Sequence, residues 1–347
     1  MVKGIDLAPL LRLAVRMDKF TELKKIYETP LFQLMQRARN TFLEHWKEDE
    51  IQLCKLLSIK TGGCSEDCGY CSQSAHHPGA DTKREALMTK EQVLPIARQA
   101  RDSGATRFCM GAAWKGVREG EEKFESVVET IREVSKLGME VCVTLGELTE
   151  GAAQRLKEAG LTAYNHNIDT SPEHYSKITT THTFDDRLRT IRHVQKAGIS
   201  VCCGGILGMG ESENDRIRML ETLTGFDPYP ESVPINMLMA IEGTPLEKQP
   251  PIDVFELVRM IATTRIALPK SKVRLSAGRS RLSREAQALC FFAGANSIFF
   301  GDKLLTAGNP SEHEDLELLA ELNLLPQLPN SELAKAPKKH HLQAALV

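Results

Sequence analysis

Residues 106–146 set the architecture: TRFCMGA (106–112) is followed by EKFESVVETIREVSKLG (122–138) and then by EVCVTLG (140–146). The outer two runs are short and apolar, as buried strands are, whereas the middle run repeats its apolar residues at the spacing of a helix. A strand, a helix and a second strand in this order predict a parallel β-α-β unit.

The same alternation recurs along most of the chain. The helix-like runs between the strands open with Thr or Asp and end at Gly, which are favoured N-cap and C′ residues. Alternating strands and helices predict an α/β protein, and eight repeats favour a closed (β/α)₈ TIM-type barrel. A doubly wound open sheet is the alternative. The eight predicted strands are 55–61, 106–112, 140–146, 161–169, 199–205, 233–239, 272–278 and 296–302.

The pattern divides the chain into three parts. Residues 1–50 carry apolar residues at helical spacing, in LAPLLRLAV (7–15) and PLFQLMQRARNTFLEHW (30–46), and predict an N-terminal helical extension. Residues 51–310 form the predicted barrel. Residues 311–347 predict a C-terminal helix and then a flexible tail, which is expected to be disordered because it lacks periodicity after Leu325.

Composition narrows the class of protein. The chain has 347 residues with 44 Lys and Arg and 46 Asp and Glu, a net charge of −2. Without a basic field the sequence favours neither nucleic acid nor a membrane surface as a partner, and no apolar run reaches the roughly 18 residues of a membrane span. We therefore expect a soluble, cytoplasmic protein. Its nine cysteines are too few for a secreted disulfide scaffold and suggest metal binding or catalysis.

Alternation within the predicted strands separates the residues that face the helices from those that face the barrel lumen. Placing the apolar residues outward turns three cysteines, several amides and two arginines inward. Burying so many polar groups costs several kcal/mol unless each finds a partner, so the lumen is expected to hold something polar. A core of mutually hydrogen-bonded side chains is the alternative. The inward set is Arg107, Cys109, Cys142, Thr144, Asn165, Asn167, Asp169, Cys202, Asn236, Arg274 and Ser276.

A cysteine motif follows the first predicted strand. The segment TGGCSEDCGYCSQSAHH (61–77) places Cys64, Cys68 and Cys71 on one short loop. A 4Fe-4S cluster usually takes four cysteines, so three would leave one iron with an open coordination position. A structural zinc site with His76 or His77 as the fourth ligand is the alternative.

The spacing C-x₃-C-x-aromatic-C, formed by Cys64, Cys68, Tyr70 and Cys71, resembles the hallmark of the radical S-adenosylmethionine superfamily. Between residues 51 and 310 the chain further resembles the biotin synthase family. The segments that carry this likeness are TRFCMGAAW (106–114), YNHNIDTSPE (164–173), GGILGMGE (204–211), ESVPINML (231–238), VRLSAGR (273–279) and AGANSIFFGDKLLT (293–306).

The resemblance implies a sulfurtransferase that inserts sulfur into dethiobiotin to form biotin, the last step of biotin biosynthesis, by 5′-deoxyadenosyl radical chemistry. It implies a 4Fe-4S cluster on Cys64, Cys68 and Cys71, with S-adenosylmethionine as cosubstrate. It also implies a homodimer and flavodoxin or ferredoxin as reductant. The family's second centre is a 2Fe-2S cluster that supplies the sulfur, and its ligands match Cys109, Cys142, Cys202 and Arg274.

The resemblance also assigns contacts. Tyr70, Asn167, Asp169 and Arg187 match residues around S-adenosylmethionine, although Arg187 could instead be a solvated helix charge. The positions that match contacts to dethiobiotin are Asn165, Asn167, Asn236 and Thr306. One departure is Ala307, where relatives can carry Thr, so a hydroxyl to the substrate carboxylate can be missing.

Other conspicuous residues have simpler interpretations. Cys54, Cys203 and Cys290 are expected to be small core residues, and His166 a hydrogen-bonded core histidine facing outward. The GGILGMGE segment (204–211) lacks the spacing and the Lys of a phosphate-binding loop and is expected to approach the methionine moiety closely. Two rival functions remain: another barrel-type radical enzyme, such as the hydrogenase-maturation or methylornithine-forming relatives, and a non-catalytic zinc-binding protein.

Overall fold

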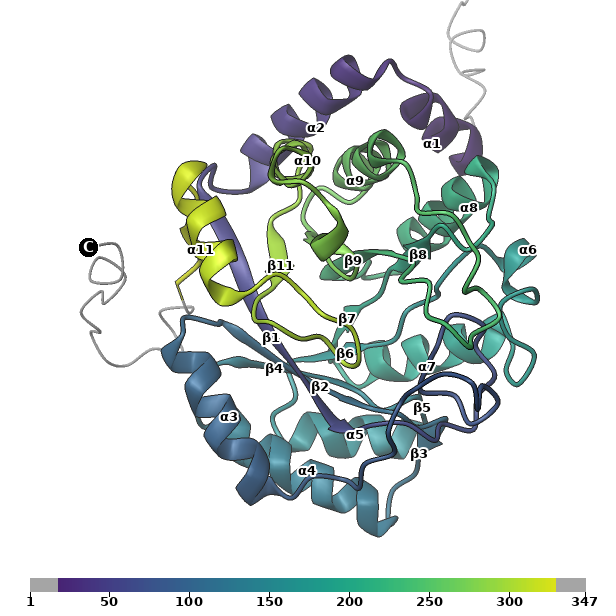
Figure 1. Ribbon diagram of the computed structural model, residues 1–347, viewed down its shortest axis with the longest axis vertical. Coiled ribbons are helices and arrows are strands. Elements are labelled where there is room, and N and C mark those ends of the chain that lie inside the picture. Colours follow the sequence, from purple (N-terminus) through teal and green to yellow (C-terminus); the bar gives the residue numbers. More distant parts are fainter. Residues whose placement is uncertain (1–17, 329–347) are drawn as a thin grey trace, which may run out of the picture.

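A closed barrel of parallel strands forms the centre of the computed structural model, which describes residues 18–328 (Figure 1). Eight strands close the ring. The sixth of them along the chain (232–237) pairs with the fifth on one side and with the seventh on the other, so no strand edge is left open. In their order around the barrel they are β1 (Glu50–Lys60), β2 (Arg107–Ala112), β4 (Glu140–Thr144), β6 (Ala163–Asn165), β7 (Ser200–Cys202), β9 (Ser232–Met237), β10 (Lys272–Leu275) and β11 (Ser297–Phe299). The predicted TIM-type barrel is confirmed, and the doubly wound alternative is wrong.

Short strands extend this ring. β3 (Gly116–Val117) pairs with β5 (Glu147–Leu148) beyond the ends of β2 and β4. β8 (Gly205–Leu207) resumes after β7 and runs along the far end of β9. β12 (Leu325–Pro326) pairs with the start of β1, so the chain remains attached to the barrel at the beginning of the predicted tail. Residues 329–347 of that tail lie outside the described range.

Helices cover the outside of the barrel, and most begin where the sequence predicts. Thr149, Thr183 and Asp253 each accept a backbone N–H with their side chains, as N-caps do. The helices are α1 (Lys19–Tyr27), α2 (Leu31–His45), α3 (Lys90–Asp102), α4 (Glu122–Ser135), α5 (Glu150–Glu158), α6 (Pro172–Tyr175), α7 (Phe184–Lys196), α8 (Glu213–Thr224), α9 (Val254–Ala267), α10 (Arg284–Phe292) and α11 (Glu312–Glu321).

The N-terminal extension packs on the outer surface. α1 contacts α8 and α9, and α2 lies against α9, where Figure 1 shows both as purple helices outside the green ones. The helix predicted from 30–46 is therefore confirmed, whereas the helical run 7–15 lies outside the described residues. No helix between residues 18 and 328 is both long enough and apolar enough to cross a membrane.

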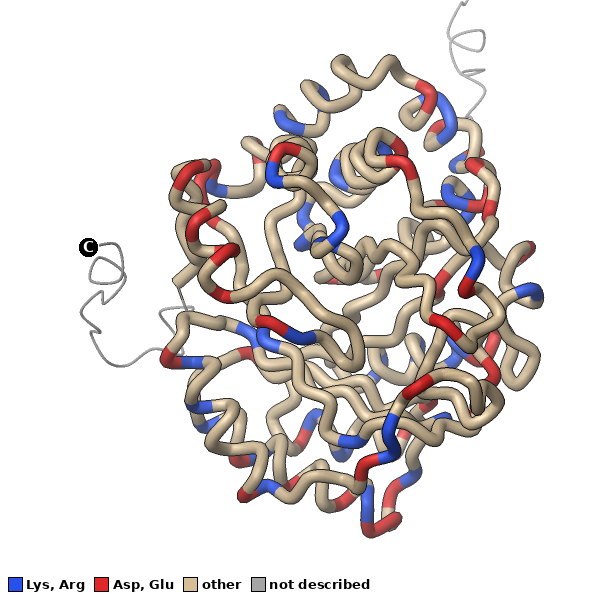
Figure 2. The backbone as a smooth tube through the Cα atoms, in the orientation of Figure 1, with Lys and Arg blue, Asp and Glu red and all other residues tan. Residues whose placement is uncertain are grey.

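Packing confirms the predicted alternation. The outward residues of the strands, such as Phe108, Val141 and Val273, join one large apolar cluster with the helices. Cys109, Cys142 and Cys202 form a separate cluster inside the barrel, with Ala163, Leu56 and Phe299 around them. Charged residues of both signs are interspersed over the outer helices (Figure 2). The lumen is therefore a second compartment, separated from the outer apolar layer by the strands.

One buried ion pair fastens α11 to the barrel. Both oxygens of Asp315 accept from Arg279 at 2.7 Å, and neither side chain is more than 1% exposed. We expect Asp315→Asn to lower the free energy of unfolding by about 3 kcal/mol, because the arginine is left with an uncompensated buried charge. Denaturant unfolding would measure this loss. The matched control is Glu317→Gln on the exposed face of the same helix, and an equal loss in both variants would contradict the prediction.

Candidate active site

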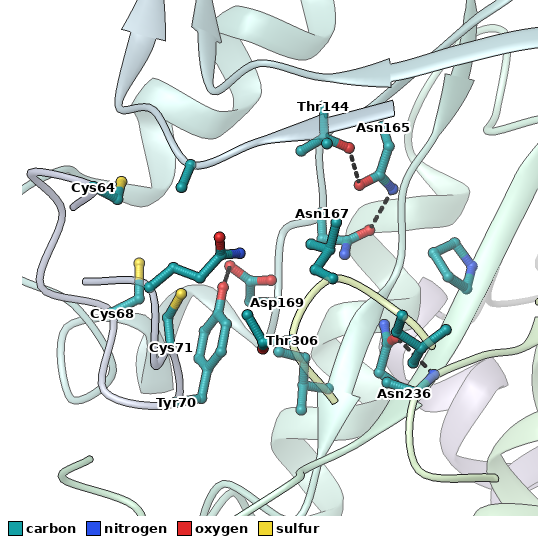
Figure 3. Close-up of a pocket in the computed structure, with 18 of the residues that line it drawn as sticks. Cys64, Cys68, Tyr70, Cys71, Thr144, Asn165, Asn167, Asp169, Asn236 and Thr306 are labelled. Atoms are coloured by element: carbon teal, nitrogen blue, oxygen red, sulfur yellow. Dashed lines mark hydrogen bonds between the residues drawn. The ribbon is translucent and has the colours of Figure 1, made fainter. Parts of the chain in front are cut away.

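A cavity of about 350 Å³ opens at the carboxyl ends of the strands and reaches into the lumen (Figure 3). Active sites of this fold lie at that end of the barrel. The cavity collects nearly every predicted site residue: Cys64, Cys68, Tyr70, Cys71, Cys109, Cys142, Asn165, Asn167, Asp169, Arg187, Asn236, Arg274 and Thr306. Cys202 is fully buried just behind the cavity wall, where its sulfur lies 3.5 Å from Asn165 Nδ2.

The cysteine loop follows β1 through a tight turn. Gly62 and Gly63 both have a positive φ, +69° and +67°, a backbone conformation that residues other than glycine rarely adopt. The loop then folds back on itself, since the Cys64 N–H donates to Gln73 O and the Ala75 N–H donates to Cys64 O. The Cys71 N–H donates to Cys68 O, which brings the second and third cysteines into a single turn.

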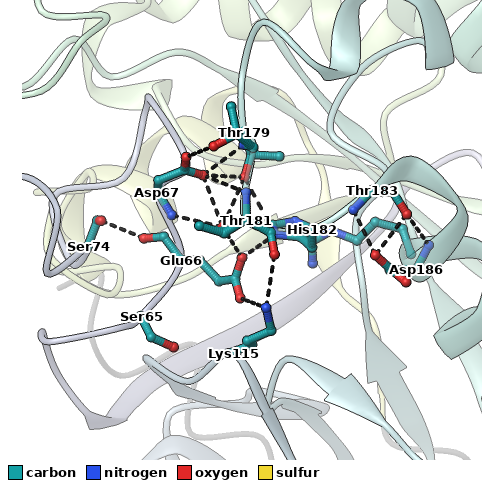
Figure 4. Close-up of polar contacts among 12 residues, drawn as sticks. Ser65, Glu66, Asp67, Ser74, Lys115, Thr179, Thr181, His182, Thr183 and Asp186 are labelled. Carbon is teal, nitrogen blue, oxygen red and sulfur yellow. Dashed lines mark hydrogen bonds and ion pairs between the residues drawn. The ribbon is translucent and has the colours of Figure 1, made fainter.

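Two carboxylates between the cysteines fix the loop to a distant segment (Figure 4). Asp67 accepts from Thr179 Oγ1 at 2.7 Å and from the Thr180 N–H at 2.9 Å. Glu66 is bonded to Thr181 and His182 and pairs with Lys115 Nζ at 3.1 Å. The loop is thus held in place by bonds that do not use its thiols.

The three loop thiols are arranged differently from the ligands of a single ion. Two ligands of one zinc ion lie about 4 Å apart, since each Zn–S bond is about 2.3 Å long. Within residues 18–328, no three His, Cys, Asp or Glu side chains could ligate one metal ion in this arrangement. His76 and His77 each point a ring nitrogen at a backbone carbonyl, of Ser65 and Cys68 respectively. Both histidines of the zinc alternative are thus engaged with the backbone of the loop.

Burial raises the pKa of all three thiols, to about 12 for Cys68 and about 11 for Cys71. Each thiol must lose its proton to become a metal ligand. Loading of the loop with metal therefore releases protons.

A polar triad lies beside the cysteine loop. The Tyr70 hydroxyl donates to Asp169 Oδ2 at 3.1 Å, and Arg187 Nη2 lies 3.4 Å from the same oxygen. Arg187 Nε also donates to the Tyr175 hydroxyl at 2.7 Å. Burial raises the pKa of Asp169, although Arg187 opposes the shift. Arg187 is therefore a largely buried partner of Asp169, with 15% of its side chain exposed, and the alternative of a solvated helix charge is wrong.

A ladder of amides continues from this triad into the lumen. Thr144 Oγ1 donates to Asn165 Oδ1 at 2.9 Å, and Asn165 Nδ2 donates to Asn167 Oδ1 at 3.1 Å (Figure 3). Across the cavity, Asn236 Nδ2 donates to Gly205 O and its Oδ1 accepts from the Ala277 N–H. Thr306 Oγ1 lies 3.3 Å from Ser72 Oγ at the mouth. Each of these side chains is held by a neighbour that fixes its orientation.

The three lumenal cysteines surround one arginine. Cys109, Cys142 and Cys202 pack together, and the interaction among the three thiols raises the pKa of Cys142 and lowers the pKa of Cys109 and Cys202. Arg274 Nη1 lies 3.6 Å from Cys202 Sγ, while Nη2 is buried without a hydrogen-bond partner among the described residues. Ser232 and Ser276 have buried hydroxyls that are likewise unpaired in the described structure. These unsatisfied groups indicate that the lumen is shaped to hold a further group.

An ion network closes the opposite end of the lumen. Arg107, fully buried, donates to Glu140 at 2.7 Å and to Glu231 at 2.8 Å, and Lys272 pairs with both carboxylates. Gln52 also donates to Glu140. Alternation in β2 predicts only that Arg107 faces inward. Its partners come from other strands, so the closed floor could not be inferred from any single segment.

The interpretation of His166 is wrong, whereas Cys54 is a buried core residue as expected but differs in its position on the strand. His166 packs beside Tyr164, with ring centroids 6.2 Å apart, but both ring nitrogens are buried without a partner in the described residues. It is therefore not hydrogen-bonded as expected, and it lines the cavity instead of facing outward. Burial lowers the pKa of its imidazole. Cys54 lies well inside β1, which begins at Glu50 rather than at 55, and its sulfur is 3.5 Å from Ser297 Oγ on the lumenal side.

Cys203 and Cys290 are core residues, as predicted. Cys203 belongs to the outer apolar cluster, and Cys290 is buried on α10. Glu211, which ends the glycine-rich segment, has a role that the sequence pattern does not predict. Its carboxylate accepts the N–H groups of Gly208 and Met209 and pairs with Arg216 at 2.8 Å. Glu211 therefore fixes the turn that borders the cavity after β8.

Fold and site together define the class of protein: a parallel barrel with a three-cysteine loop at its catalytic end is the arrangement of the radical S-adenosylmethionine superfamily. Residues 58–223 match the family described as "Radical SAM superfamily", and residues 234–325 match the "Biotin and Thiamin Synthesis associated domain". The chain belongs to the biotin synthase family. It is 56% identical to the biotin synthase of Methylorubrum populi over 316 residues, which cover 90% of this chain and 92% of that protein. It is 54% identical to the biotin synthase of Myxococcus xanthus over 319 residues, covering 92% of each.

Solved structures share the fold at low sequence identity. Methylornithine synthase superposes with a TM-score of 0.73 at 18% identity, covering 90% of this chain and 95% of that one. The FeFe-hydrogenase maturase of Carboxydothermus hydrogenoformans gives a TM-score of 0.76 at 19% identity, covering 90% of this chain and 76% of that one. Similarity at this identity supports the barrel alone and does not extend to the reaction.

Proposed function

We propose that this chain converts dethiobiotin to biotin by inserting one sulfur atom. The observation that carries the proposal is the order of groups along one cavity. Three loop thiols lie at the mouth, amides lie in the middle, and three more thiols with Arg274 lie in the lumen. Identity of 56% to a curated biotin synthase supports the same reaction. The combination of Cys109, Cys142, Cys202 and Arg274 argues against another radical enzyme of the same fold.

Cys64, Cys68 and Cys71 would hold a 4Fe-4S cluster with one open iron position. When bound, this cluster and S-adenosylmethionine supply a 5′-deoxyadenosyl radical that removes hydrogen from dethiobiotin. The chain contributes the orientation of the cosubstrate. Asp169 and Asn167 offer oxygen acceptors suited to ribose hydroxyls, and Arg187 offers a buried positive charge suited to a carboxylate. Tyr70 holds Asp169 in place through its hydroxyl.

Cys109, Cys142, Cys202 and Arg274 would hold a 2Fe-2S cluster, whose sulfide is the sulfur that enters the product. Three thiols in mutual contact and an arginine with a free N–H fit such a group. The floor of charged residues beneath them excludes water from the lumen, which protects a radical from side reactions.

Asn165, Asn167, Asn236 and Thr306 would contact dethiobiotin between the two clusters. Amide side chains offer both donors and acceptors to the ureido ring. Thr306 lies at the mouth, where the substrate tail would end, and Ala307 beside it provides no hydroxyl for the carboxylate. We further propose that flavodoxin or ferredoxin is the reductant, that the assembly is a homodimer and that its location is cytoplasmic. Membership of the biotin synthase family supports these three points.

Anaerobic analysis of iron and sulfide tests this proposal. Fully loaded protein is expected to contain about six iron and six inorganic sulfide per chain, because one 4Fe-4S and one 2Fe-2S cluster are present. The absorption spectrum of the same sample should show both clusters. One zinc per chain without sulfide would overturn the proposal and restore the zinc alternative. Four iron alone would overturn only the second cluster.

A further inference from the structure

A fourth thiol faces the lumen beside the proposed second cluster. Cys54 lies on β1, whose inward residues include Gln52 and Leu56. Its sulfur is 3.5 Å from Ser297 Oγ and 3.5 Å from Gln52 Oε1, and the side chain is completely buried. It is absent from the apolar cluster that the strands form with the helices, where Cys203 and Cys290 lie. Cys54 is therefore separate from the ordinary core cysteines.

Cys54 and Arg274 share one hydroxyl. Ser297 lies on β11, between β1 and β10, and its Oγ accepts from Arg274 Nε at 3.1 Å. The Cys54 sulfur is therefore separated from the guanidinium by a single hydroxyl group.

Arg274 is an unusual ligand in an otherwise ordinary set. A guanidinium stays protonated and is a poor metal donor, whereas a 2Fe-2S cluster normally takes four cysteine thiolates. Cys109, Cys142 and Cys202 supply three of them, and Cys54 would bring the number to four. Arg274 is only 1% exposed, and its Nη2 has no hydrogen-bond partner in the described structure. Removing the guanidinium would therefore leave a buried space that a fourth ligand would fill.

We propose that Cys54 is a reserve ligand of the second cluster, which binds iron in place of Arg274 when the guanidinium is removed. In Arg274→Ala the S–H bond of Cys54 would break and an Fe–S bond would form in place of the missing arginine ligand, so a proton is released and no oxidation state changes. Because this inference rests on the proposed second cluster, the experiment begins by measuring that cluster in the unaltered protein.

Four proteins are compared after anaerobic loading: the unaltered chain, Arg274→Ala, Arg274→Ala/Cys54→Ser and Arg274→Ala/Cys203→Ser. We expect Arg274→Ala to keep about two iron and two sulfide beyond the first cluster, and Arg274→Ala/Cys54→Ser to lose both. Arg274→Ala/Cys203→Ser is the matched control, since it also replaces a buried thiol, and it should retain the second cluster. The four irons of the first cluster report that each variant has folded.

Mössbauer spectra of ⁵⁷Fe-loaded protein give a readout that does not depend on the double variant. In Arg274→Ala the two irons of the second cluster should become equivalent, because both then have two thiolate ligands. Retained second-cluster iron in Arg274→Ala/Cys54→Ser would overturn the reserve-ligand proposal, as would inequivalent irons in Arg274→Ala or loss of the cluster from that single variant. Absence of a second cluster from the unaltered chain would instead overturn the proposed function, and the reserve ligand with it.

Discussion

Cys68→Ala is expected to abolish formation of both 5′-deoxyadenosine and biotin. The variant removes one of three thiols that would hold the first cluster, and the loop has no spare cysteine to replace it. Iron and sulfide should fall by about four each per chain, to the content of the second cluster alone. Chromatography of reactions with dethiobiotin, S-adenosylmethionine and a reductant would measure both products.

The structure separates loss of the ligand from loss of the fold in this variant. The Cys68 carbonyl, which accepts from the Cys71 N–H and contacts His77 Nε2, is unchanged by the substitution. Asp67 still holds the loop to Thr179 and Thr180. Cys290→Ala is the control, because that thiol is equally buried but lies on α10, away from the cavity. Substantial 5′-deoxyadenosine from Cys68→Ala would contradict the assignment of the loop.

Alternation within strands predicted much of the site because neighbours on a strand must face opposite ways. Cys109, Cys142 and Cys202 lie on three separate strands, yet each could be turned inward by the apolar residues beside it. The same reasoning could have found Cys54. The first strand begins five residues before its predicted start, and extending the alternation back from Leu56 turns Cys54 inward.

Contacts between distant segments could not be predicted in this way. Asp169 has a φ of +64°, so the chain has left the extended conformation where its carboxylate meets Tyr70 and Arg187. Alternation carries no information about such a turn. The contacts of Glu66 with His182 and Lys115 likewise join parts of the chain that only closure of the barrel brings together. Sequence patterns specify which face a residue takes, whereas its partner depends on the complete fold.

The adjacent pair Cys202 and Cys203 gives the sharpest test of the lumenal site. One step along a strand reverses the face of a side chain, and the two thiols lie in different compartments. We expect Cys202→Ala to lose the 2Fe-2S absorption and all biotin formation, because a ligand of the proposed sulfur source is missing. Cleavage of S-adenosylmethionine at the cysteine loop should continue, so 5′-deoxyadenosine is still formed.

Cys203→Ser is the matched variant, and it should keep the 2Fe-2S absorption and a substantial yield of biotin. Its thiol packs in the apolar layer with residues such as Val201, and the more polar hydroxyl that replaces it costs roughly 1–3 kcal/mol of stability in that layer. Spectra, both products and the denaturation midpoint would be measured side by side for the two variants. If Cys203 proved essential and Cys202 dispensable, the register of β7 would be wrong. Asn165 and Asn167 would then lose their proposed places as well, because Asn165 is positioned by its pairing with Cys202.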